Sequence, residues 1–165
     1  MKNKFLFIIS LVYLLIYQLN TSYSAEQFNF KITEIDVTEN GNLIIGSKGG
    51  KAVTNDGLEI IGENFVYNKL TNILNVSGSV KFTDTIDGTE IYADKATYFK
   101  NDEIVFTEGN SKAINKNNII TAVKFKFNKI ENILNAEDAV EFVDIKKETI
   151  INTDKATYVK EDDMI

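Results

Sequence analysis

The fold is decided by residues 91–98, which read Ile-Tyr-Ala-Asp-Lys-Ala-Thr-Tyr, and by their near copy Ile-Asn-Thr-Asp-Lys-Ala-Thr-Tyr at residues 151–158. The similarity extends further, because residues 65–102 match residues 125–162 without a gap, at a period of 60 residues. Half of this period also repeats, with anchors at Val37, Tyr67, Tyr98, Phe127 and Tyr158. Repetition at a fixed period indicates that one supersecondary unit is stacked several times. We therefore expect function to reside in the array of units rather than in a single cleft.

Apolar and polar residues alternate within each unit, which is typical of a half-buried β-strand. The parity of this alternation changes in the middle of residues 91–98. Ile91 and Ala93 share one face of an ideal strand, whereas Ala96 and Tyr98 share the other. All four can point inward only if the strand accommodates one extra residue between them. We therefore predict a β-bulge or sharp corner at Asp94-Lys95 and at the equivalent position of every unit.

A turn and a second alternating strand follow each anchor. In the unit that begins at Tyr67, this strand places apolar or small residues on one face, at Leu74, Val76, Gly78, Val80 and Phe82. Such alternation is typical of antiparallel sheets with one buried and one solvated face. Tight hairpins are predicted at the dipeptides Asn40-Gly41, Asp56-Gly57 and Asp87-Gly88. Because residues 25–165 show no sustained helical period, we expect an all-β fold.

The N-terminal residues indicate an export signal. Lysines precede an apolar run at residues 5–17, and small residues follow at Ser22 and Ser24. As a helix this run would reach roughly 20 Å, which is short of the ~30 Å hydrocarbon layer of a membrane. We therefore expect residues 1–24 to be a cleaved signal peptide and residues 25–165 to form one exported domain. Retention of the run as an inner-membrane anchor is the alternative.

The composition excludes several classes of function. The chain has 18 basic and 24 acidic residues and a net charge of −6, which opposes nucleic acid as a partner. Because the chain lacks Cys and His, we expect no disulfide, no zinc site and no catalytic triad. Asp94-Lys95 and Asp154-Lys155 recur with the repeat, whereas an active site needs one unique constellation. We therefore expect no catalytic residue, no metal and no cofactor. Gly46 and Gly49-Gly50 are interpreted as loose turns.

Residues 91–98, followed by Glu-Ile-Val-Phe-Thr-Glu-Gly-Asn at residues 103–110, resemble the OstA-like family of lipopolysaccharide transport. Units of that family carry an Ala-Asp-x-Ala-x-Tyr strand and then an apolar strand that leads to Gly-Asn or Gly-x-Val. Residues 78–80 fit the second form, and the resemblance covers residues 28–165. The positions that depart from the pattern are Val123 for the corner acid, Asp138 for the glycine and Val37 for the aromatic anchor.

The resemblance implies an open, twisted β-jelly roll, V-shaped in section, built from two-strand repeats of about 30 residues. Its apolar groove would shield the acyl chains of lipopolysaccharide in the periplasm and carry the lipid toward the outer membrane. The implied partners are other OstA-like transport proteins, through head-to-tail contacts of edge strands, and the outer-membrane translocon.

Two members of the family fit the length and the signal: the soluble periplasmic bridge protein, and the N-terminal periplasmic domain of the outer-membrane lipopolysaccharide-assembly protein. Ile165 stands only seven residues after the anchor Tyr158, where earlier units begin a strand. We therefore expect the domain to be truncated at its C-terminal end, which favours the second member.

The bulky inward residues are the candidates for contact with acyl chains, although each of them also suits an ordinary core. They are Phe65, Tyr67, Leu74, Val80, Phe82, Phe125, Phe127, Leu134 and Phe142. Candidates for contact with the anionic head of the lipid are Lys51, Lys81 and Lys112. The alternative function is that of a structural β-solenoid or adhesin-like envelope protein. An envelope hydrolase is disfavoured, because no catalytic constellation is present.

Overall fold

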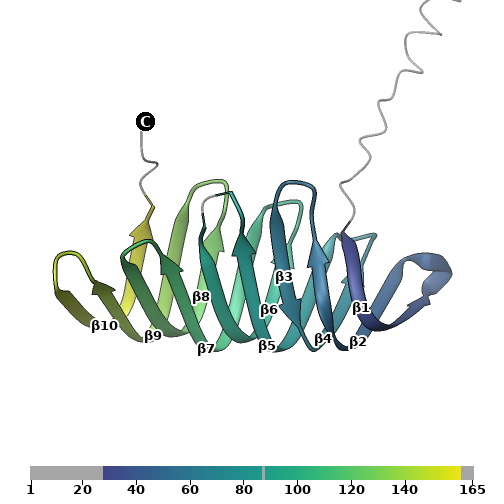
Figure 1. Ribbon diagram of the computed structural model, residues 1–165, viewed down its shortest axis with the longest axis horizontal. Helices are drawn as coiled ribbons and strands as arrows, with labels where there is room; N and C mark the ends of the chain where they lie inside the picture. The colour runs from purple at the N-terminus through teal and green to yellow at the C-terminus, as the bar shows by residue number, and fades with distance from the viewer. Residues whose placement is uncertain (1–27, 87, 161–165) are drawn as a thin grey trace, which may run out of the picture.

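The computed structural model describes residues 28–86 and 88–160, so the predicted signal peptide at residues 1–24 lies outside the described part (Figure 1). The described residues form one sheet, and their only helical segment is the short 3-10 helix η1 (Glu39–Gly41). The strands are β1 (Asn29–Thr38), β2 (Leu43–Val53), β3 (Leu58–Gly62), β4 (Asn64–Asn68), β5 (Ile73–Asp84), β6 (Glu90–Phe99), β7 (Ile104–Asn115), β8 (Asn118–Asn128), β9 (Ile133–Asp144) and β10 (Thr149–Val159). The prediction of an all-β fold is confirmed.

The sheet is an antiparallel meander. Its strand order is β1-β2-β3-β5-β6-β7-β8-β9-β10, and β4 also pairs with β2 and β5. Strands β3 and β4 therefore occupy one position in the sheet, with a break at Glu63. A β-solenoid would stack parallel coils, so the solenoid alternative is wrong for the part of the chain that the structure describes.

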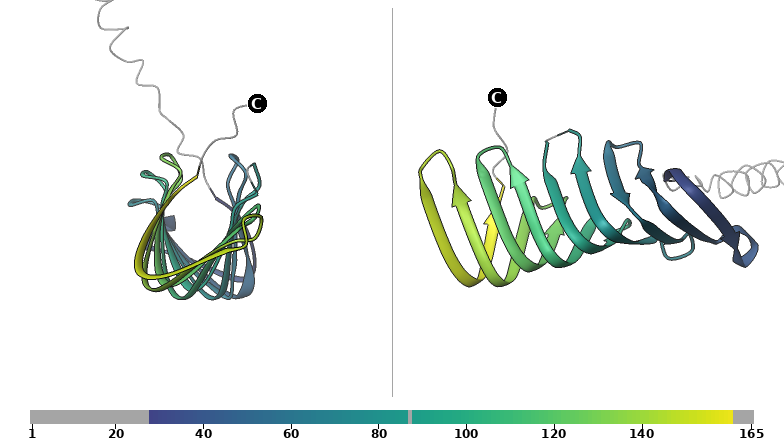
Figure 2. Two further views of the ribbon diagram at one scale, coloured as in Figure 1. Left: turned by 90° about the vertical axis from the view of Figure 1, so that its left-hand side faces the viewer. Right: turned by 60° about the horizontal axis from the view of Figure 1, so that its bottom comes forward.

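The sheet folds along its length into an open trough with a U-shaped section (Figure 2). The turns lie on two edges of this trough. We call the edge with the turns after β1, β4, β6 and β8, together with the end of β10, rim 1. The edge with the turns after β2, β5, β7 and β9 is rim 2.

The predicted corner is present in the middle of the strands. The β6–β7 register shifts between Tyr92 and Lys95, and similar shifts occur in the β1–β2, β5–β6, β7–β8, β8–β9 and β9–β10 pairs. Residues 94 and 95 are both exposed, and the four apolar residues around them are all buried, as the change of parity required. Asp94 belongs to the corner, because its Oδ2 accepts a hydrogen bond from Nδ2 of Asn110 at 2.9 Å.

The partner strand turns the same corner with two consecutive residues at positive φ. These pairs are Lys48 and Gly49 in β2, Gly78 and Ser79 in β5, Gly109 and Asn110 in β7, and Asp138 and Ala139 in β9. The glycine of the family pattern is therefore a corner residue. The interpretation of Gly46 and Gly49-Gly50 as loose turns is wrong, because they lie within β2. A Cβ at Gly50 would lie 2.5 Å from Cα of Ile32, so the close approach of the β1 backbone requires this glycine.

The inward face of the trough forms a continuous apolar core. At the N-terminal end, the Phe28 ring meets the Tyr67 ring edge-on, with centroids 5.0 Å apart, and also contacts Tyr98 at 6.1 Å. Phe28 precedes β1 on the side of rim 2, whereas Tyr67 and Tyr98 lie near rim 1. These rings therefore connect the two limbs of the U. Among the described residues, no helix is long and apolar enough to cross a membrane.

Substitution of the corner glycine Gly78 by alanine should lower the free energy of unfolding by about 1–3 kcal/mol. Gly78 has φ +82°, and an added Cβ would lie 2.7 Å from Cβ of Glu63. Urea titration followed by circular dichroism measures the change.

Gly41 is the matched control, because it has φ +91° but no atom within 4 Å of an added Cβ. Gly41→Ala should therefore lower the free energy of unfolding by only about 1 kcal/mol, because only the positive φ disfavours alanine there. The reverse change Asp138→Gly, at φ +66°, should stabilise the protein. Equal losses in the two alanine variants would contradict the crowded corner.

Candidate lipid-binding trough

The nine residues predicted to contact acyl chains all lie on the inward face. Eight of them are buried in one cluster, and Phe142 packs against that cluster while remaining half-buried. They come from both limbs, because each strand contributes residues before and after its corner. The structure therefore brings the predicted set together, and it shows that these side chains also form the core. Their contact with lipid stays a prediction.

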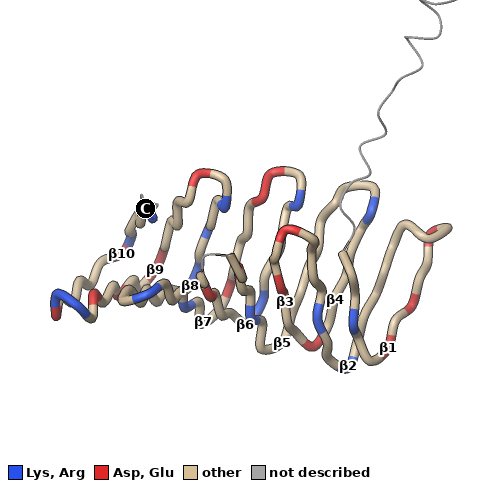
Figure 3. Tube along the Cα trace, turned by 45° about the horizontal axis from the view of Figure 1, so that its top comes forward, with Lys and Arg blue, Asp and Glu red and all other residues tan. Residues whose placement is uncertain are grey.

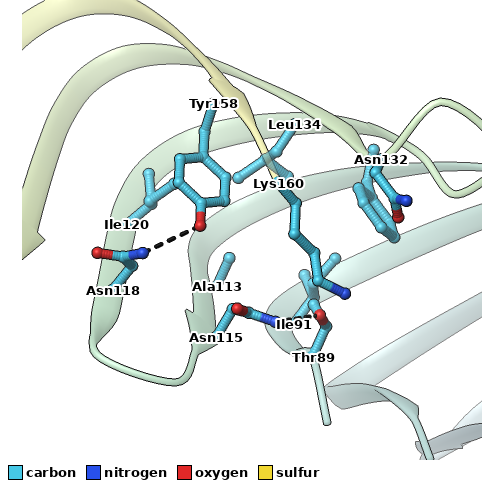
Figure 4. A pocket seen from close by; sticks show the side chains of 11 residues that line it. Thr89, Ile91, Ala113, Asn115, Asn118, Ile120, Asn132, Leu134, Tyr158 and Lys160 are labelled. Atoms are coloured by element: carbon cyan, nitrogen blue, oxygen red, sulfur yellow. Dashed lines mark hydrogen bonds between the residues drawn. The ribbon is translucent and has the colours of Figure 1, made fainter. Parts of the chain in front are cut away.

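A small pocket lies within the trough towards β10 (Figure 4). Its lining is mainly apolar and comes from Thr89, Ile91, Ala113, Asn115, Asn118, Ile120, Phe127, Asn132, Leu134, Tyr158 and Lys160. At its mouth, Asn118 Nδ2 donates a hydrogen bond of 3.0 Å to the Tyr158 hydroxyl. The enclosed space is about 20 Å³, which is room for about one water molecule. The protein's own side chains thus fill this part of the trough, whereas a more open pocket of about 320 Å³, lined by residues that include Phe142 and Tyr158, adjoins it beside β10.

A charged contact joins the two rims across the mouth. The Nζ atom of Lys129, in the turn after β8 on rim 1, lies 2.9 Å from Oδ2 of Asp56 and 3.7 Å from Oδ2 of Asp84, both at rim 2. A third carboxylate, that of Glu103 on rim 1, lies 3.8 Å away. The Lys129 side chain is only 14% exposed. This contact holds the limbs together between residues 73 positions apart in the sequence.

The pKa directions show that this contact favours the charged forms of both groups. Burial raises the pKa of Asp56, but hydrogen bonds from Lys129 and Thr54 outweigh burial and hold the pKa below its ordinary value of 3.8. Burial likewise lowers the pKa of Lys129, yet the hydrogen bond and the attraction of Asp56 outweigh burial and raise that pKa. Both groups are therefore charged at neutral pH.

The lysines that the sequence suggested for the lipid head lie elsewhere. Lys51 and Lys81 stand on the outer face of the sheet, in ion pairs of 2.6 Å with Glu59 and Glu90. Lys112 alternates with buried residues of β7 and is exposed on the same outer face. The lysines at the mouth belong to rim 1 and were missed, although the sequence carries their signal: a lysine stands two residues after Tyr67, Tyr98, Phe127 and Tyr158.

An antiparallel meander with a corner in each strand and an apolar inner face defines the class: an open β-jelly roll. A solved structure of this class is similar to the chain with a TM-score of 0.65 and 14% sequence identity, covering 72% of this chain and 94% of that one. It is LptH from Pseudomonas aeruginosa, described as the LptA-homologous periplasmic component of the conserved lipopolysaccharide transport device. No protein-family model matches the chain. No curated protein matches it either. The predicted fold is thus confirmed.

Loss of the Asp56 carboxylate should weaken the closed trough. Asp56→Asn should lower the free energy of unfolding at pH 7 by about 1 kcal/mol, because a charge-assisted hydrogen bond is lost from a partly exposed site. A carboxyl whose pKa is depressed by folding stabilises above its unfolded pKa, and this stability is lost as the pH falls through the folded pKa. The wild type should therefore lose its advantage over Asp56→Asn below about pH 4. Chemical unfolding from pH 7 to pH 3 measures the difference.

Glu137→Gln is the matched control. Glu137 pairs with Lys155 at 3.0 Å, but both side chains are at least half exposed. An exposed pair of this kind contributes little to stability, so this variant should follow the wild type. If Glu137→Gln lowered the free energy of unfolding as much as Asp56→Asn does, the contact at the mouth would have no special role in stability.

Proposed function

We propose that this protein is a periplasmic, non-enzymatic conduit module that binds lipopolysaccharide by its acyl chains and passes it toward the outer membrane. The observation that carries the proposal is the continuous apolar inner face of a sheet that is folded into a trough but not closed by strand pairing. The shared fold supports it, because LptH is described as a component of a lipopolysaccharide transport device. The expected export signal at residues 1–24 supports the location.

Burial of an acyl chain gives the driving force. Each methylene removed from water contributes about 0.8 kcal/mol, so several chains bound inside the trough would be strongly stabilised. The closed trough offers little room for them, because the pocket inside it encloses about 20 Å³ and a larger hollow, of about 320 Å³, lies at the open end beside β10. In this proposal the limbs part during loading, which breaks side-chain contacts such as that of Lys129 with Asp56 but no ladder of backbone hydrogen bonds. The sugars and phosphates of the lipid stay outside.

The two edge strands suit the transfer of lipid between modules. Within the described residues, β1 pairs with β2 alone and β10 pairs with β9 alone. Near these edges the inward face is uncovered, with Ile35, Val37 and Ile151 each between 43% and 56% exposed. In this proposal, edge strands of other transport proteins of the same fold extend the sheet, and the trough continues into theirs and on to the outer-membrane translocon.

Site-specific photo-crosslinking tests the proposal. A photoreactive phenylalanine analogue at Phe142 should crosslink to lipopolysaccharide, because Phe142 points into the trough and is half-buried. Phe82 is less suitable, since it is 1% exposed and a bulky change there would disturb the core. The adducts are detected by mass spectrometry or by immunoblotting after irradiation.

Phe106 is the matched control, an aromatic residue on the outer face of β7 that is 40% exposed. The same analogue at this position should give no adduct. Equal labelling at the two positions, or none at Phe142 in folded protein, would overturn binding inside the trough.

A further inference from the structure

A row of lysines follows rim 1. Each lysine stands two residues after an aromatic anchor, and the four are Lys69, Lys100, Lys129 and Lys160. We call this set the lysine rim. Each of its backbone N–H groups donates to a carbonyl oxygen of an earlier turn of rim 1, over distances of 2.8–3.1 Å: Lys69 to Asn42, Lys100 to Asn72, Lys129 to Glu103 and Lys160 to Asn132. These bonds hold the four lysines at equivalent positions on the rim.

The lysines repeat at every second strand, which places them about 10 Å apart along the trough. In Figure 3, blue positions recur in successive turns along one edge of the trough. All four are half-buried, which is unusual for a side chain that normally extends into solvent. Their stems therefore cover the edge of the apolar interior.

Two ammonium contacts and one pocket lining place three of the four side chains. Nζ of Lys100 is 5.2 Å from the centre of the Phe28 ring, which belongs to the opposite limb. Nζ of Lys129 crosses the mouth to reach Asp56. Lys160 lines the internal pocket (Figure 4). Positive charge thus lies against or across the apolar interior at Lys100 and Lys129, in a chain whose net charge is −6.

We propose that the lysine rim binds the phosphate groups of the amphiphile whose acyl chains occupy the trough, and that Lys129 exchanges Asp56 for a phosphate when the rims part. This inference rests on the proposed function and adds a second recognition element to it. Acyl chains inside the trough place their anionic head at the mouth, beside this row. Lysine binds phosphate as a point charge and needs no fixed geometry.

The exchange balances in charge. Parting of the rims separates Lys129 from Asp56 and Asp84, which belong to rim 2, and leaves Glu103 as its neighbouring carboxylate on rim 1. A phosphate with up to two negative charges then replaces the two lost carboxylates. The lysine rim would thus keep the trough closed when it is empty and hold the lipid when it is loaded.

Binding measurements with two lipids test the proposal. Lipid A with two phosphates and a neutral glycolipid with the same acyl chains are titrated into the purified protein. Lys129→Gln should weaken binding of the bisphosphorylated lipid about five- to tenfold, because one charge-assisted contact is lost. Binding of the neutral glycolipid should not weaken. Lys160→Gln is the second variant, in case Lys129→Gln fails to fold.

Lys124→Gln is the matched control. Lys124 lies in β8, the strand that leads to Lys129, and its Nζ is 3.5 Å from Oδ2 of Asp138 on the exposed outer face. Its loss should leave the affinity for both lipids unchanged. Inorganic phosphate alone is the third ligand, and it should not raise the melting temperature of the wild type as lipid A does. If inorganic phosphate raised the melting temperature as much as lipid A does, the lysine rim would be a site for free phosphate, and the proposal would be overturned.

The remaining outcomes separate this inference from the proposed function. Tighter binding of both lipids by Lys129→Gln would make Lys129 a closing contact only and would overturn the phosphate site. Equal weakening for both lipids, or none for either, would also overturn it, while lipid binding by the wild type would still support the proposed function. If the wild type binds neither lipid, both proposals are wrong.

Discussion

Each long strand of this sheet must turn a corner halfway along, and the rest of the structure depends on that constraint. One strand of a pair presents two consecutive exposed residues, as at Asp94 and Lys95, and its neighbour supplies two residues at positive φ, as at Gly78 and Ser79. Without the corner, the alternation would send half of the apolar side chains to solvent. Corners stacked from strand to strand fold the whole sheet lengthwise into a trough.

The same inward side chains face two demands. Residues such as Phe65 and Phe82 are buried in one core cluster, and the pocket beside Phe127 and Leu134 encloses only about 20 Å³. A carrier of acyl chains needs these surfaces to become available. The sheet can meet both demands, because the limbs are joined across the mouth by side chains, such as Lys129 with Asp56 and Tyr158 with Asn118. The limbs can separate while the backbone ladders that define the fold stay intact.

The charges that meet at the mouth suit this mechanism. An acidic chain would repel an anionic lipid at long range, yet rim 1 carries a lysine after every second strand, beside acids such as Glu103, and the carboxylates of Asp56 and Asp84 on rim 2 face Lys129. Burial strengthens their attraction, which favours the closed trough. An anionic ligand at the mouth competes directly with those carboxylates, so closure and recognition would use the same lysines.

The sequence by itself determined the strands, the corners and the inward face, because each of these follows from local alternation and from the change of parity at positions such as Asp94-Lys95. The same alternation would have placed Lys51 and Lys81 on the outer face, and the lysine after each anchor was visible in the repeat. Only the tertiary structure decided which residues meet across the mouth. Lys129 and Asp56 are 73 positions apart, and their contact depends on how tightly the sheet folds. That curvature results from all the corners and strand twists together, so the pattern of any one segment does not predict it.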